Sequence, residues 1–182
     1  MNKQFFNTRF MVITLTILIT SALRFLPHYP NFTPVAGIAL FGGTYFSNKK
    51  VAFIIPFAAM FLSDIVLGFH STMWAVYLSF ALIVMIGFLL KKGKRVSNIL
   101  LASVASSVLF FFITNFAFWL TGGTYPLSFP GLTECYIAAI PFFHYTMLGD
   151  LFYVGIFFGA FELLQLKLPI LAEASLSPRE IR

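Results

Sequence analysis

Four polar side chains interrupt the long apolar stretches of this 182-residue chain and are the residues best suited to chemistry. They are Arg24, Asp64, Asn115 and Asp150. A charged side chain at the centre of a membrane-spanning helix costs about 2.5–3.5 kcal/mol on insertion scales. We therefore expect these residues to face a partner, a cavity or a ligand. A guanidinium, two carboxylates and an amide supply hydrogen-bond donors and acceptors, and together they predict a polar pocket among apolar helices.

The composition indicates that lipid surrounds most of the chain. Hydrophobic residues make up 59% of the sequence and charged residues only 10%, against roughly 25% charged residues in soluble domains. The apolar runs are long and lack the period-two alternation of membrane β-barrels. The net charge of +6 comes from basic clusters between apolar runs, which is typical of membrane topology and not of nucleic-acid binding. We expect an all-α polytopic membrane protein.

The apolar runs predict a single transmembrane domain over residues 1–182, with residues 167–182 as a cytoplasmic tail. Six spans are expected, at approximately residues 10–26, 35–46, 51–68, 73–90, 99–120 and 145–166. The second span is too short to cross a hydrocarbon core of about 30 Å at about 1.5 Å per residue. It is rich in glycine and alanine, which allow close helix packing. We expect a short helix surrounded by protein, and a re-entrant hairpin that does not cross is the alternative.

Two connections carry further expectations. The proline-rich segment 27–34 before the second span is expected to dip into the membrane, which irregular backbone does only where protein or a cavity surrounds it. It could act as a gate over the pocket. After the fifth span, we expect a loop over residues 121–133 and then a separate half-helix over residues 135–143, with Pro141 near its end.

The basic residues predict the orientation. With six crossings, every lysine and arginine except Arg24 falls on the same side of the membrane. Basic residues accumulate on the cytoplasmic side, so the pattern predicts both termini inside (N-in/C-in). The clusters lie at positions 3 and 9, 49 and 50, 91, 92, 94 and 95, and 167, 179 and 182.

This orientation places the charged and amide side chains of the spans in their outer halves, with Glu162 as the exception, together with the histidines and the single cysteine of the outer loops. The predicted substrate-binding residues are Arg24, His28, Asn31, Asp64, His70, Asn115 and Asp150. Apolar packing is expected to close the pocket from beneath. The alternative is that Arg24, Asp64 and Asp150 pair with one another and only stabilise the bundle. No catalytic residues are predicted, no Cys/His cluster has metal-site spacing, and no phosphate-binding loop is present.

Several segments resemble a known family. They are RFLPHYPNFTPVAGIALFGGTYF (24–46), LSDIVLGFH (62–70), TNFAFWL (114–120) and YPLSFPGLTECYIAAIPFFHYTMLGDL (125–151). They are similar to an uncharacterised family of small bacterial membrane proteins that is itself similar to the S components of energy-coupling-factor (ECF) transporters. The resemblance implies a six-helix, S-component-like bundle in the bacterial inner membrane, with both termini inside. It also implies a vitamin pocket at the outer face, formed by helices and the loop after the first helix.

Two further features of the resemblance concern partners and substrate. Many S components dock on an ATPase module through an Ala-x-x-x-Ala patch on the first helix. Span one lacks this patch, which puts docking on an ECF-type ATPase module in question. A fainter resemblance to solitary cobalamin-transporting proteins makes cobalamin the favoured substrate, although not a permanently bound cofactor. The candidate cobalt ligands are His28, His70, His144 and Cys135.

The expected function is that of a membrane subunit, not an enzyme, that binds a vitamin-like micronutrient and translocates it for uptake. Three alternatives remain. The chain could be a proton-coupled carrier of small solutes, for which carboxylates within the membrane are the usual relay. It could be a membrane enzyme that uses the same outer cavity, or a structural subunit of a larger complex.

Overall fold

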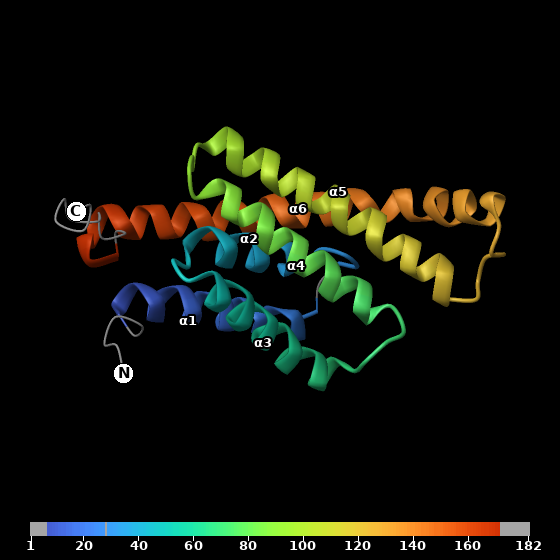
Figure 1. Ribbon diagram of the computed structural model, residues 1–182, viewed down its shortest axis with the longest axis horizontal. Helices are drawn as coiled ribbons and strands as arrows, with labels where there is room; N and C mark the ends of the chain where they lie inside the picture. Colours follow the sequence, from blue (N-terminus) through green and yellow to red (C-terminus); the bar gives the residue numbers. More distant parts are fainter. Residues whose placement is uncertain (1–6, 28, 172–182) are drawn as a thin grey trace, which may run out of the picture.

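The computed structural model describes residues 7–27 and 29–171, and these residues form an all-helical bundle without strands (Figure 1). Five of its helices are long and apolar enough to cross a membrane, and one is shorter. The predicted class of helical membrane protein is confirmed. The elements are α1 (Thr8–Ala22), the 3₁₀ turn η1 (Leu23–Phe25), α2 (Val35–Tyr45), α3 (Lys49–Leu67), α4 (Met73–Leu90), α5 (Val96–Thr121), α6 (Phe129–Lys167) and the 3₁₀ turn η2 (Pro169–Leu171).

The short helix α2 lies at the centre of the bundle. All 11 of its residues are buried, and it contacts α1, α3, α4, α5 and α6. The expectation of a short, protein-surrounded helix is confirmed. Because no helix face is left for lipid, α2 can carry small residues on several sides, and its neighbours approach it closely.

The closest approach is between α2 and α4, where two glycines meet. A Cβ atom added to Gly43 would lie 2.3 Å from the carbonyl oxygen of Val84, and one added to Gly87 would lie 2.7 Å from that of Leu40. Beside them, the Thr44 hydroxyl lies 3.2 Å from the Gly87 carbonyl oxygen and can donate to it. Only glycine fits at positions 43 and 87 without moving the backbone.

The structure corrects the expectation for the region after α5. The half-helix predicted over 135–143 and the span predicted over 145–166 are one continuous helix, the 39-residue α6, and the loop before it is shorter than predicted. Ser128 caps α6 by accepting a hydrogen bond from the Gly131 amide at 3.3 Å. Pro130 lies in the first turn, where its missing N–H costs nothing. Pro141 removes one backbone hydrogen bond, which membrane helices tolerate.

Charge is separated along the long axis of the bundle. The starts of α1 and α3, the α4–α5 loop and the end of α6 share one end, next to both termini (Figure 1). The described basic residues at that end are Arg9, Lys49, Lys50, Lys91, Lys92, Lys94, Arg95 and Lys167. Arg24 lies toward the other end, in η1, so the structure brings together the clusters that the sequence pattern assigns to one side.

The glycine contact generates a stability prediction. We expect Gly43→Ala and Gly87→Ala each to destabilise the purified protein, by about 1–3 kcal/mol, because the added methyl group overpacks the α2–α4 contact. Thermal unfolding in detergent measures the effect. Gly155→Ala and Gly159→Ala are matched controls, since a Cβ atom at these positions meets nothing within 4 Å. Equal stability of the two pairs of variants would contradict the packing argument.

Candidate functional site

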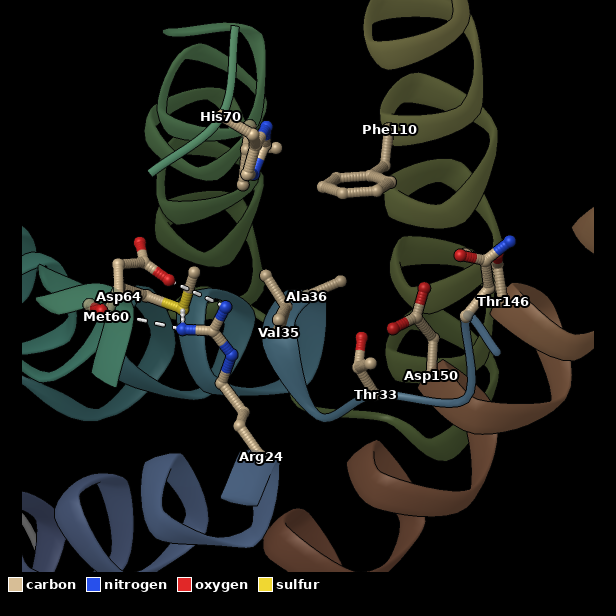
Figure 2. A pocket seen from close by; sticks show the side chains of 12 residues that line it. Arg24, Thr33, Val35, Ala36, Met60, Asp64, His70, Phe110, Thr146 and Asp150 are labelled. Carbon is tan, nitrogen blue, oxygen red and sulfur yellow. Dashed lines mark hydrogen bonds and ion pairs between the residues drawn. The ribbon is translucent and has the colours of Figure 1, made fainter. Parts of the chain in front are cut away.

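A cavity of about 180 Å³ lies among the α1–α2 segment, the start of α2, and helices α3 to α6. It is lined by five residues that the sequence predicts as substrate-binding: Arg24, Asn31, Asp64, His70 and Asp150. These residues come from η1, the α1–α2 segment, α3, the α3–α4 loop and α6, so the fold brings together positions that are far apart in the sequence. Figure 2 shows Arg24 and Asp64 on one wall and Asp150 on the other.

The first wall carries a buried ion pair. The Arg24 guanidinium lies 2.7 Å from Asp64 Oδ1, and the Tyr77 hydroxyl donates to Asp64 Oδ2 at 2.8 Å. Arg24 also donates to the hydroxyl of Ser63. Asp64 is only 4% exposed. Both of its oxygens are therefore satisfied, and its charge is matched by Arg24.

The second wall carries a carboxylate with a different environment. Asp150 is 2% exposed, and its Oδ2 lies 2.6 Å from the hydroxyl of Ser107 on α5. No cationic side chain contacts it within residues 7–27 and 29–171. The α1–α2 segment packs directly against Gly149, the residue before Asp150. A Cβ atom added to Gly149 would lie 3.1 Å from Phe32 Cα. Asp150 is therefore fixed at the cavity wall by a hydroxyl and by packing alone.

The start of α2 lies between the two walls. Val35 and Ala36 line the cavity, and Figure 2 shows them between the Arg24–Asp64 pair and Asp150. Pro34 precedes the helix and supplies no side-chain cap. The backbone N–H groups of a first helical turn have no partner within their own helix. The cavity therefore meets an uncapped helix N-terminus as well as three charged side chains.

The other predicted site residues lie elsewhere. Asn115 lines a neighbouring cavity of about 140 Å³, which shares Asn31, Phe110 and Thr146 with the main cavity. Its side-chain amide donates to the Phe111 carbonyl of its own helix at 2.8 Å.

Of the three candidate cobalt ligands that the structure describes, only His70 lines the main cavity. His144 is exposed and packs on Tyr145, with ring centroids 3.9 Å apart. Cys135 is buried beside the Asn115 carbonyl. His28 lies outside the described residues. A metal-binding group of three or more His, Cys, Asp or Glu residues is not found in the described part of the chain.

The alternative that Arg24, Asp64 and Asp150 all pair with one another is half right. Arg24 pairs with Asp64, whereas Asp150 bonds to Ser107. Three residues that complete the two walls, Ser63, Tyr77 and Ser107, were not among the predicted site residues. Tyr77 lies close to the start of α4 (Met73–Leu90), where aromatic belts form, so its position gave no signal of a role at the cavity. Ser107 and its neighbour Ser106 both donate to backbone carbonyls of α5, to Ser103 and Ala102 respectively, so nothing in the sequence distinguishes Ser107.

Beneath the cavity, aromatic side chains fill the bundle, as expected. Phe41 of α2 packs edge-on against Phe157, Phe158 and Phe161 of α6, with ring centroids 5.5–6.1 Å apart.

Further toward the basic end, the Tyr45 hydroxyl donates to Glu162 at 2.5 Å. Buried Arg9 donates there to the carbonyl oxygens of Leu171, at 2.5 Å, and Tyr45, at 3.2 Å. These side chains pack the bundle between the cavity and the basic end.

The ion pair generates a second prediction. We expect Arg24→Met to destabilise the protein by about 3–5 kcal/mol, because it leaves Asp64 buried and unpaired. The double variant Arg24→Met/Asp64→Asn should regain part of this loss, since it removes the uncompensated charge. Unfolding in detergent measures both. Exposed Arg95 provides the control, and Arg95→Met should change stability by no more than about 0.5 kcal/mol. A double variant no more stable than Arg24→Met would contradict the pairing.

Comparisons with known proteins assign the chain to a family but not to an activity. The profile of DUF6580, a family of unknown function, matches residues 4–171, and the chain belongs to this family. A search of curated proteins found no match. A search of solved structures also found none.

Proposed function

We propose that this member of the DUF6580 family binds a small polar solute in the cavity between Arg24–Asp64 and Asp150 and carries it across the membrane. One observation supports the proposal above all others: two buried carboxylates lie on facing walls of one cavity, and one of them has no cationic partner within the described chain. A structural ion pair needs neither a cavity nor a second carboxylate. A binding site for a polar ligand needs both a cavity and a few converging polar groups.

The resemblance to ECF S components supports uptake as the direction of transport. In that arrangement both termini are cytoplasmic and the cavity opens toward the outside of a bacterial inner membrane. The separation of basic residues from the cavity along the bundle agrees with this orientation under the positive-inside rule. The ligand would be a vitamin-like micronutrient, and energy would come from a partner such as an ATPase module or from the gradient of the ligand.

The volume of the cavity limits the size of the ligand. Ligand pockets typically have volumes of about 300–1,000 Å³, and this cavity has about 180 Å³. A corrin macrocycle with its nucleotide loop is far larger than this space. We therefore propose a micronutrient much smaller than cobalamin, with His70 contributing a hydrogen bond at the rim and no cobalt ligand required.

Blocking the cavity tests the proposal. We expect Thr146→Phe to reduce solute binding by at least about tenfold, because Thr146 lines both the main and the neighbouring cavity. The matched control is Thr133→Phe on the same helix, where the side chain is exposed and lies outside both cavities. Mass spectrometry of compounds bound to the purified protein, followed by titration of the identified compound, gives the affinities. Absence of any bound compound from the wild type, or equal binding by both variants, would refute the proposed site.

The orientation has its own test, in a background that carries Cys135→Ala. We expect Ser71→Cys, in the exposed α3–α4 loop, to react in intact cells with a maleimide that cannot cross membranes. Lys92→Cys, in the α4–α5 loop at the basic end, should react only after the membrane is opened. Both positions are exposed in the structure, so a difference reports sidedness. The reverse pattern would overturn the N-in/C-in orientation.

A further inference from the structure

Asp64 and Asp150 differ in what the protein supplies to them. Asp64 has Arg24 as a counter-ion and Tyr77 as a hydrogen-bond donor. Asp150 is buried as deeply but has only the Ser107 hydroxyl, which also lies 3.1 Å from the Ser103 carbonyl oxygen. A hydroxyl has a single proton to donate, so Ser107 satisfies one of these acceptors at a time. The cavity lining thus holds two carboxyl groups and one guanidinium, and Asp150 is the carboxyl group without a counter-ion in the described part of the chain.

The start of α2 offers the complementary charge. The first hydrogen bond of the helix runs from the Ile38 amide to the Pro34 carbonyl oxygen, at 2.9 Å. The amides of Val35, Ala36 and Gly37 have no hydrogen-bond acceptor within the described residues. Unpaired first-turn N–H groups and the helix dipole together favour a bound anion. Val35, Ala36 and Gly37 are buried, and this helix end lies between Arg24 and Asp150 (Figure 2).

From this juxtaposition, and resting on the function proposed above, we propose that the ligand is a small zwitterion. Its cationic nitrogen contacts the Asp150 carboxylate, and its carboxylate contacts the first turn of α2 on the side of Arg24. A zwitterion satisfies the unpaired carboxylate and the uncapped helix together without adding net charge to the membrane interior. Half-helix N-termini that bind substrate carboxylates at membrane depth follow the same physical logic.

The remaining surface of the cavity suits the apolar part of such a molecule. Phe110 projects toward the space between the two walls (Figure 2). Val76 and Met60 also line the cavity. An aromatic face next to a bound ammonium group adds a cation–π attraction. The site therefore fits an amino-acid-like compound with a short side chain better than a neutral ring or a dianion.

The test uses the full chain in lipid nanodiscs, with an aqueous small-molecule extract of cells as the probe. Compounds retained after gel filtration are released and identified by mass spectrometry for the wild type, Asp150→Asn and Glu134→Gln. Glu134 is an exposed carboxylate of α6 outside the cavity. We expect the wild type and Glu134→Gln to retain the same compound, with both an ammonium and a carboxylate group. Asp150→Asn should bind it about 10- to 100-fold more weakly, the usual effect of losing a charge-assisted hydrogen bond.

Derivatives of the retained compound separate the two contacts. In the wild type, the N-acetyl derivative and the methyl ester should each bind at least about tenfold more weakly than the parent compound. In Asp150→Asn the ester should still lose affinity, whereas the N-acetyl derivative should bind about as well as the parent. If Asp150→Asn does not fold, the derivatives tested on the wild type decide the question.

Three outcomes would overturn the inference. A retained compound without a cationic nitrogen would do so while leaving the proposed function intact. Equal affinity of wild type and Asp150→Asn, with only the pH dependence of transport altered, would make Asp150 a proton relay. If the wild type retains no compound at all, the proposed function fails as well, and this result is distinct from the other two.

Discussion

The cost of burying charge inside a lipid-surrounded bundle is the constraint on which the rest of this structure depends. A buried ion is tolerated when a counter-ion and hydrogen bonds replace the water that it has lost. The chain meets this requirement in full for Asp64, through Arg24 and Tyr77. It meets the requirement only in part for Asp150, through Ser107. The two carboxylates thus divide between an internal ion pair and a site that a bound molecule could complete, and the cavity lies between them.

The cavity exists because α2 is short. At about 1.5 Å per residue, its 11 residues cover about half of a hydrocarbon core of about 30 Å. The start of the helix lies inside the bundle, next to the cavity. Gly149 lets the α1–α2 segment approach α6 closely, while the glycine contact between α2 and α4 fixes the depth of the helix. The small residues therefore allow the uncapped N-terminus of α2 to lie between the two walls.

The sequence was sufficient to predict the helical class, the buried short helix and five residues of the cavity. Each of these follows from the free-energy cost of exposing particular residues or backbone groups to lipid. Charges within apolar runs need partners, and a run too short to span needs protein around it. Side-chain partners across helices could not be predicted, because Tyr77 lies near the start of α4, where an aromatic belt is expected, and Ser107 is one of several serines of α5. The separate half-helix was a wrong prediction, since Pro141 was read as a helix end without weighing the cap at Ser128. Cys135 and His144 were grouped with the pocket by depth alone, which does not show where around the bundle a residue points.

The basic end of the bundle constrains how a bound solute could leave. Aromatic rings of α2 and α6 pack against each other beneath the cavity. Arg9 of α1 donates buried hydrogen bonds to Tyr45, at the end of α2, and to Leu171, at the end of the described residues. An inner gate would have to separate α6 from α2, break the Tyr45–Glu162 hydrogen bond and expose several phenylalanines. A tilt of the whole molecule would break none of these contacts. For the transport function proposed above, the side chains that close the basic end favour movement of the bundle as one body over the opening of a channel through it.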